Sequence, residues 1–197
     1  MLTSRFYRAI VFAGELHVSQ VRKGTAIPYV AHLMAVAALV LEHGGTEEQA
    51  IAGLLHDAIE DQGECFEGGA DGLRQEIERG FGTAVLAIVE ACTDADTIPK
   101  PPWRDRKEAY IAHIRTAPAD VLIVSCADKL HNARAILSDY RAIGDALWQR
   151  FTAGKDGTLW YYQALVDAFQ SNPATPRTLV DELAQTVTQI VELAHEK

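Results

Sequence analysis

Four ionisable side chains follow two leucines in the segment LLHDAIED, residues 54–61: His56, Asp57, Glu60 and Asp61. Acidic side chains are seldom buried without a partner. The segment is therefore either a solvated helix end or the wall of a site that holds a cation. On a helix, residues four positions apart share a face, which pairs His56 with Glu60 and Asp57 with Asp61. His56 and Asp57 are about 100° apart around the axis and could bind one metal ion, but two ligands do not make a site.

Two further polar residues interrupt apolar runs elsewhere in the chain. His32 interrupts the most apolar helical pattern, YVAHLMAVAALVL, and Asp128 follows VLIVSCA. A lone buried histidine is more often a core residue that is hydrogen-bonded to a carbonyl group, but a buried carboxylate needs a cation or several donors. Together with His56 and Asp57, these residues offer two imidazole nitrogens and two carboxylate oxygens. This mixed set suits a divalent ion such as manganese, iron, zinc or magnesium.

Basic residues that could bind an anion lie upstream, in RKGTAIP. Arg22 can stack on a base or bind phosphate through two N–H groups, whereas Lys23 is a point charge for phosphate. Taken alone, the pair would be an ordinary basic helix C-terminus that is favoured by the helix dipole. Asn132 and Ala135 follow Asp128 by four and seven positions, so one helix face leads away from the predicted metal as a shallow polar strip.

The periodicity of the chain around these residues is helical nearly throughout, with no convincing alternating strand and no internal repeat. Capping, glycine and proline patterns predict helices at residues 4–20, 29–42, 46–61, 73–80, 83–93, 103–116, 118–140, 143–151, 158–170 and 175–196. The proline-rich DADTIPKPPW is expected to be extended or irregular. We predict an all-α fold, a compact bundle of about nine or ten helices. It would form a single domain over residues 1–197, with the motifs within about 1–170 and a C-terminal helix at about 175–196.

Composition and charge exclude several classes of protein. The formal net charge of −9 disfavours long-range attraction to nucleic acid or to an anionic membrane, so an anionic ligand must be captured by a few placed cations or a metal. No stretch reaches the roughly 20 apolar residues of a membrane span and no export signal is visible, so a cytoplasmic location is expected. Cys65, Cys92 and Cys126 form no CxxC pair and are expected to be reduced. The apolar stripe of the last helix is compatible with a monomer or a homodimer.

Three segments occur together and in order: RKGTAIPYVAH, LLHDAIED and CADKLHNAR. The combination resembles the HD-superfamily phosphohydrolases, and within them the hydrolase domain of RelA/SpoT-type enzymes and the small stand-alone alarmone hydrolases. The resemblance covers roughly residues 1–170. It implies metal-dependent hydrolysis of the 3′-diphosphate of guanosine tetra- or pentaphosphate, (p)ppGpp, which yields GDP or GTP and pyrophosphate.

The resemblance also implies roles for individual residues. One divalent ion, most often Mn²⁺ in the family, would be held by His32, His56, Asp57 and Asp128. Glu60 and Asp61 would orient and deprotonate the attacking water. The nucleotide substrate would be bound by Arg22, Lys23, Asn132, Lys100 and Tyr161.

The chain departs from the family pattern in places. Ala135 occupies a position that is often polar, and Asp96 lies near the point where the family usually offers a lysine for phosphate. Substitutes for that lysine would be Lys100, or the next helix's Arg104, Arg106 and Lys107. The segment GTLWYYQAL is similar to a late aromatic segment that closes the pocket in single-domain relatives. Core packing accounts nearly as well for its Trp160, Tyr161 and Tyr162.

Other functions are compatible with some of the same residues. A related enzyme could act on another nucleotide, such as NADPH through its 2′-phosphate, or on a nucleoside monophosphate. A non-catalytic nucleotide sensor would keep the pocket and lose Glu60 or Asp61, both of which are present. A purely structural helical scaffold would not need Asp128 after an apolar run.

Overall fold

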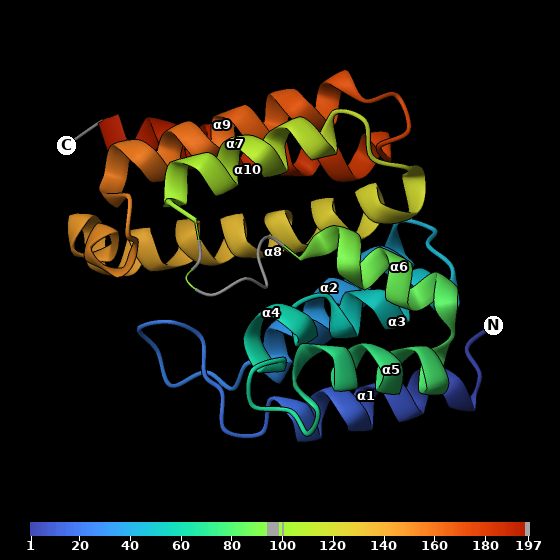
Figure 1. Cartoon of the computed structure of the whole chain (residues 1–197). Helices are drawn as coiled ribbons and strands as arrows, with labels where there is room; N and C mark the ends of the chain where they lie inside the picture. Colours follow the sequence, from blue (N-terminus) through green and yellow to red (C-terminus); the bar gives the residue numbers. More distant parts are fainter. Residues whose placement is uncertain (94–98, 100, 196–197) are drawn as a thin grey trace.

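In the computed structural model of the protein, helix α8 (Ala119–Ile143) lies between two groups of helices (Figure 1). The structure describes residues 1–93, 99 and 101–195. Within these ranges there are ten α-helices and one 3₁₀ helix, and extended pairing is limited to an isolated bridge between Val21 and Pro28. The predicted all-α fold and the predicted number of helices are confirmed.

The first group of helices covers one side of α8 (Figure 1). It comprises α1 (Ser4–Leu16), α2 (Val30–Glu42), α3 (Glu47–Leu55), α4 (Ala58–Gln62), α5 (Gly69–Phe81) and α6 (Thr83–Cys92). Helices α2, α3 and α6 pack directly on α8, and α1 and α5 pack on the outer side of these helices. This arrangement buries the apolar α2 pattern and places its histidine in the interior.

The second group covers the opposite side of α8. It comprises α7 (Trp103–Ile114), the 3₁₀ helix η1 (Gly144–Arg150), α9 (Gly154–Ser171) and α10 (Arg177–His195). Helix α10 packs along α8 and α9, and α7 packs on α9. The apolar stripe predicted for the last helix therefore packs against other helices of the same chain, and its Leu179 and Leu183 are fully buried.

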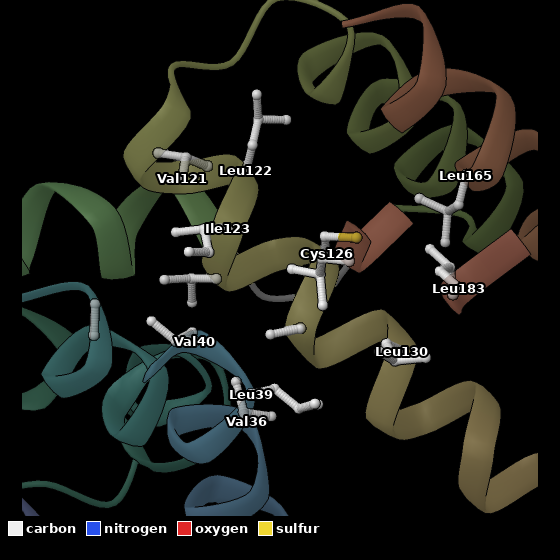
Figure 2. Packing of buried hydrophobic residues seen from close by; sticks show 14 of the residues in the cluster. Val36, Leu39, Val40, Val121, Leu122, Ile123, Cys126, Leu130, Leu165 and Leu183 are labelled. Carbon is white, nitrogen blue, oxygen red and sulfur yellow. The ribbon is translucent and has the colours of Figure 1, made fainter. Parts of the chain in front are cut away.

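The hydrophobic core is continuous across α8. Figure 2 shows α2 side chains such as Val36 next to α8, with Leu165 of α9 and Leu183 of α10 near the other face. Each of these three side chains is fully buried, and such burial stabilises a fold by about 1.5–3 kcal/mol per large aliphatic residue. The two groups of helices are therefore held together through α8.

Local signals set several helix ends. Thr46 caps α3 as predicted: its hydroxyl accepts from the Gln49 N–H at 3.2 Å, and the Gln49 carboxamide oxygen accepts from the Thr46 N–H at 2.7 Å. This capping box satisfies two backbone N–H groups at the helix start. Gly144, with φ of 57°, ends α8 in a conformation that only glycine adopts readily.

Two helix boundaries differ from the sequence prediction at places that matter for the site. Helix α1 ends at Leu16, so the following residues form a loop that reaches α8. The helix predicted through LLHDAIED is interrupted at His56 and Asp57, where Asp57 has φ of −97° and ψ of 0°. This backbone region is sparsely populated and common at active sites. The Asp61 N–H still donates to the Asp57 carbonyl at 2.9 Å, so the turn between the two acids is kept.

Two further sequence expectations can be compared with the structure. No helix in the described part of the chain has both the length and the apolar character needed to cross a membrane. The three cysteines, all within the described ranges, form no disulfide; Cys126 is buried in the core and Cys65 is exposed.

Candidate metal centre and adjoining cavity

The structure brings together all four residues that the sequence predicts as metal ligands. His32 comes from the first turn of α2, His56 and Asp57 from the junction of α3 and α4, and Asp128 from α8. Asp57 Oδ2 lies 2.9 Å from His56 Nε2 and 3.6 Å from His32 Nε2. Asp128 Oδ1 lies 3.2 Å from His32 Nε2 and 3.5 Å from His56 Nε2. We call these four residues the donor cluster.

The donor cluster fits a divalent cation. The Nε2 atoms of His32 and His56 are buried, and neither makes a hydrogen bond among the described residues although each faces carboxylate oxygens. Ligand atoms that share an ion at bond lengths of about 2.0–2.2 Å lie about 3.0–3.5 Å apart, which agrees with the spacings above. Buried nitrogens without hydrogen bonds are rare in proteins, so a cation accounts for this arrangement better than core packing does.

Hydrogen bonds on the outer side orient two of the donors. The His56 Nδ1–H donates to the Gly53 carbonyl oxygen at 2.8 Å, so Nε2 is the ring nitrogen that faces the cluster. The Tyr29 hydroxyl donates to Asp57 Oδ2 at 2.5 Å. Burial and the Asp57 carboxylate raise the pKa of Tyr29 above its usual range, so the phenol stays protonated and remains the donor.

The carboxylates of the donor cluster are ionised. Burial alone raises the pKa of Asp128, but Lys129, with Nζ 2.6 Å from Oδ2, and the two histidines hold that pKa well below its usual range. Burial likewise raises the pKa of Asp57, and His56 and His32 lower it well below the ordinary value. Asp128 in turn raises the pKa of Lys129, against the effect of burial. The cluster therefore presents two negative charges, and one of them is paired with a buried ammonium group.

Glu60 and Asp61, the predicted acid–base pair, lie in the first turn of α4 immediately after the cluster. Glu60 is half-buried and Asp61 is exposed. Asp61 Oδ2 accepts a hydrogen bond from Gln20 Nε2 at 2.7 Å, and the Gln20 carboxamide oxygen accepts from Gln62 Nε2 at 2.6 Å. Sequence reasoning missed Gln20, which is 41 residues from Asp61 and carries no local signal.

A cavity of about 370 Å³ adjoins the donor cluster, within the usual range for a ligand site. Its basic lining residues are Arg22, Lys23, Lys107, Lys129 and Arg150. Its aromatic lining residues are Tyr29, Trp103, Phe151, Tyr161 and Tyr162. The cavity reaches the cluster through Tyr29, Lys129 and Asn132, which contact its carboxylates. A chain of strongly negative net charge thus places five cations around one cavity.

Most of the residues predicted to bind substrate line this cavity. They are Arg22, Lys23, Asn132 and Tyr161, and Ala135 lines it as well. Tyr161 and Tyr162 are also buried, so they serve core packing and the cavity together, whereas Trp160 is absent from the lining. The predictions for Asp96 and Lys100 lie outside the described residues.

Among the three alternative cations of α7, only Lys107 lines the cavity. Arg104 lies over the Trp160 ring, and its guanidinium carbon is 3.2 Å from the ring centroid. Arg106 Nε donates to the Pro101 carbonyl at 3.2 Å. The next helix therefore supplies one cation to the cavity, as one of the sequence alternatives proposed.

Several lining residues were missed from the sequence. Lys129 had a usable signal, because a lysine beside a buried acid in an apolar run needs a partner. Arg150 had none: it lies in η1, and its Nη1 pairs with Asp139 Oδ2, another lining residue, at 2.7 Å. Trp103 begins α7 directly after the prolines, and its role depends on the packing of α7 against α9.

Comparisons with known proteins agree with one another on the family. Residues 9–159 match the model of the HD domain family. The guanosine-3′,5′-bis(diphosphate) 3′-pyrophosphohydrolase MESH1 of Xenopus tropicalis is 38% identical over 126 residues, which are 62% of this chain and 64% of that protein. The bifunctional (p)ppGpp synthase/hydrolase SpoT of Escherichia coli K12 is 31% identical over 138 residues, 67% of this chain but only 18% of SpoT. The solved structure of a metazoan ortholog of SpoT is 22% identical with a TM-score of 0.72, covers 94% of this chain and 96% of that one, and supports the fold.

Proposed function

The chain belongs to the HD-domain family, and we propose that it hydrolyses the 3′-diphosphate of (p)ppGpp to GDP or GTP and pyrophosphate. The relatives named above that carry this activity support the substrate. The observation that carries the proposal is the pair of buried imidazole nitrogens that face two ionised carboxylates beside a basic cavity.

We propose Mn²⁺ as the ion, held by His32, His56, Asp57 and Asp128. The nitrogen and oxygen donors suit a borderline or hard divalent metal. When bound, such an ion supplies Lewis acidity and neutralises phosphate charge. The ring orientation of His56 and the hydrogen bond from Tyr29 to Asp57 would hold the donors ready for it.

The side chains of the protein would bind the substrate and transfer the proton. Arg22, Lys23 and Lys107 would bind the phosphates and the base, and Tyr161 would close the cavity over the nucleoside. Glu60 and Asp61 would orient a water and accept its proton as its oxygen bonds to phosphorus. The bond from phosphorus to O3′ then breaks, and the proton passes to O3′ to restore the 3′-hydroxyl.

Other nucleotides remain outcomes of the test. Five cations around the cavity support a substrate with several phosphates over a nucleoside monophosphate, but NADPH also meets that condition. Retention of Glu60 and Asp61 supports an enzyme over a non-catalytic sensor. A cytoplasmic location, the single-domain organisation and a monomeric or homodimeric state stay predictions.

The test is direct. Purified protein with Mn²⁺ should convert ppGpp to GDP and pyrophosphate, followed by ion-exchange chromatography, and EDTA should abolish the reaction. NADPH and AMP serve as matched substrates and should be turned over far more slowly. Release of orthophosphate alone, or equal turnover of AMP, would contradict the proposal.

A further inference from the structure

The loop after α1 places a guanidinium group against α8. The Arg22 N–H donates to the Ile27 carbonyl at 2.8 Å and the Tyr29 N–H to the Gln20 carbonyl at 2.9 Å, which closes the loop. Gly24, with φ of 72°, makes the turn and packs on Arg150: a Cβ there would lie only 2.7 Å from Arg150 Cδ. The loop is therefore held in one position over the helix.

Arg22 contacts two residues of α8 that themselves contact the donor cluster. Its Nη2 donates to Asn132 Oδ1 at 2.9 Å, and Asn132 Nδ2 donates to Asp128 Oδ1 at 2.5 Å. Its Nη1 lies 3.3 Å from His131 Nδ1, which lies 2.8 Å from His32 Nδ1. One cation of the loop is thus linked to two predicted metal ligands through one intermediate each.

The positions of the protons follow from these contacts. A guanidinium group has only donors, so His131 Nδ1 must accept from Arg22. Two imidazole nitrogens 2.8 Å apart share one hydrogen, which places that hydrogen on His32 Nδ1. The single lone pair of His131 Nδ1 is then shared between the shorter bond from His32 and the longer one, at 3.3 Å, from Arg22. The Nε2 atom of His32 is left with its lone pair, and it is the atom that faces Asp57 and Asp128.

We propose that His131 is a positioning residue for the metal centre: held by Arg22, it keeps the His32 ring in the orientation and tautomer that bind the ion. The inference rests on the metal site of the proposed function. It gives Arg22 a second task beside substrate binding, because the same side chain supports His131 and Asn132. Outer hydrogen-bond partners of metal ligands typically contribute about 10- to 100-fold to metal affinity.

The test measures Mn²⁺ affinity by calorimetry on metal-stripped protein. His131→Leu removes the acceptor and should weaken Mn²⁺ binding by about 10- to 100-fold. His131→Asn keeps an acceptor near the Nδ1 position and should restore most of that loss. Arg134→Ala, three positions further along α8 and paired with Glu182 outside the cavity, should bind like the wild type.

A second pair of variants tests the same inference if His131→Leu fails to fold. Arg22→Gln should weaken Mn²⁺ binding by about tenfold, because it removes the hydrogen bonds that hold His131 and Asn132. The neighbouring Lys23→Gln should leave it unchanged. Equal Mn²⁺ affinity in His131→Leu and the wild type, or equal losses in the Leu and Asn variants, would overturn the inference and leave the proposed function standing. A wild-type protein that binds no Mn²⁺ would overturn both.

Discussion

The donor cluster and the opposite wall of the cavity are held in place by different interactions. The cluster's side chains lie on helices packed around α8 and are oriented by hydrogen bonds to backbone, to Tyr29 and to Asn132. The opposite wall, formed by the lining residues of α7, η1 and α9, places Lys107 5.1 Å from the centroid of the Tyr161 ring and Arg150 beside Asp139. His32, His56 and Asp128 of the cluster are buried, whereas the wall's cations Lys107 and Arg150 are partly exposed.

This contrast indicates that chemistry and recognition are built separately. A buried charge must be fully compensated, so each change in the cluster has large consequences. A partly exposed ion pair contributes only about 1 kcal/mol or less, so the wall can vary with the substrate at small cost. Four measurements would test this contrast.

Removal of Asp128 should break the cluster. Asp128→Ala should lose stoichiometric Mn²⁺ binding, measured by calorimetry, and activity should fall by about 10³-fold or more, since a catalytic metal supplies several kcal/mol. The variant also leaves Lys129 buried without its carboxylate, which should destabilise the fold by about 3–5 kcal/mol in chemical denaturation. Asp181→Ala, on α10 and beside Arg177, is the control; a similar loss there would contradict a specific role of Asp128.

Glu60→Gln should separate metal binding from rate. The change keeps the shape of the side chain but removes the proton acceptor, so kcat should fall by about 10²- to 10⁴-fold. The affinity for Mn²⁺ should stay within about threefold of the wild-type value. Steady-state kinetics and calorimetry measure the two quantities. Glu64→Gln, an exposed residue one turn later, should behave as wild type, and full activity of Glu60→Gln would remove this residue from the mechanism.

Gln20→Ala should have an intermediate effect. It deletes the carboxamide that donates to Asp61, and a hydrogen bond to a charged group contributes about 1.5–3 kcal/mol, so kcat should drop by about tenfold or somewhat more. Mn²⁺ affinity should not change, because Gln20 contacts no residue of the donor cluster among its described hydrogen bonds. A kcat equal to that of the exposed control Gln75→Ala would show that Asp61 does not need this support.

A substitution in the opposite wall should have the smallest effect. Lys107→Ala should raise KM for ppGpp by about fivefold, since a partly exposed ion pair contributes about 1 kcal/mol, with kcat nearly unchanged. Arg104→Ala, one turn earlier and stacked on Trp160 outside the cavity, should leave both constants alone. A large loss of kcat in Lys107→Ala would contradict the assignment of recognition to the opposite wall and of chemistry to the donor cluster.

The success of the sequence prediction differs between the two regions for a physical reason. His32 and Asp128 could be identified because a polar side chain inside an apolar helical run must find a partner. The same reasoning failed for Arg150 and Gln20, which are partly exposed and do not interrupt an apolar run. The helix break at Asp57 was also missed, because the periodicity of LLHDAIED is the same with or without it.

The helical fold, the capping box at Thr46, the four residues that meet in the donor cluster and the two acids that follow them could all be predicted from the sequence. These depend on helical periodicity and on the cost of burying charge, both of which act locally along the chain. The residues that support the donor cluster become apparent only once the helices are packed together. His131 and Arg22 are 109 residues apart, and their contact exists because the loop after α1 folds onto α8. Hydrogen bonds between distant polar groups leave no periodic trace in a sequence, so their partners become visible only when the helices are packed.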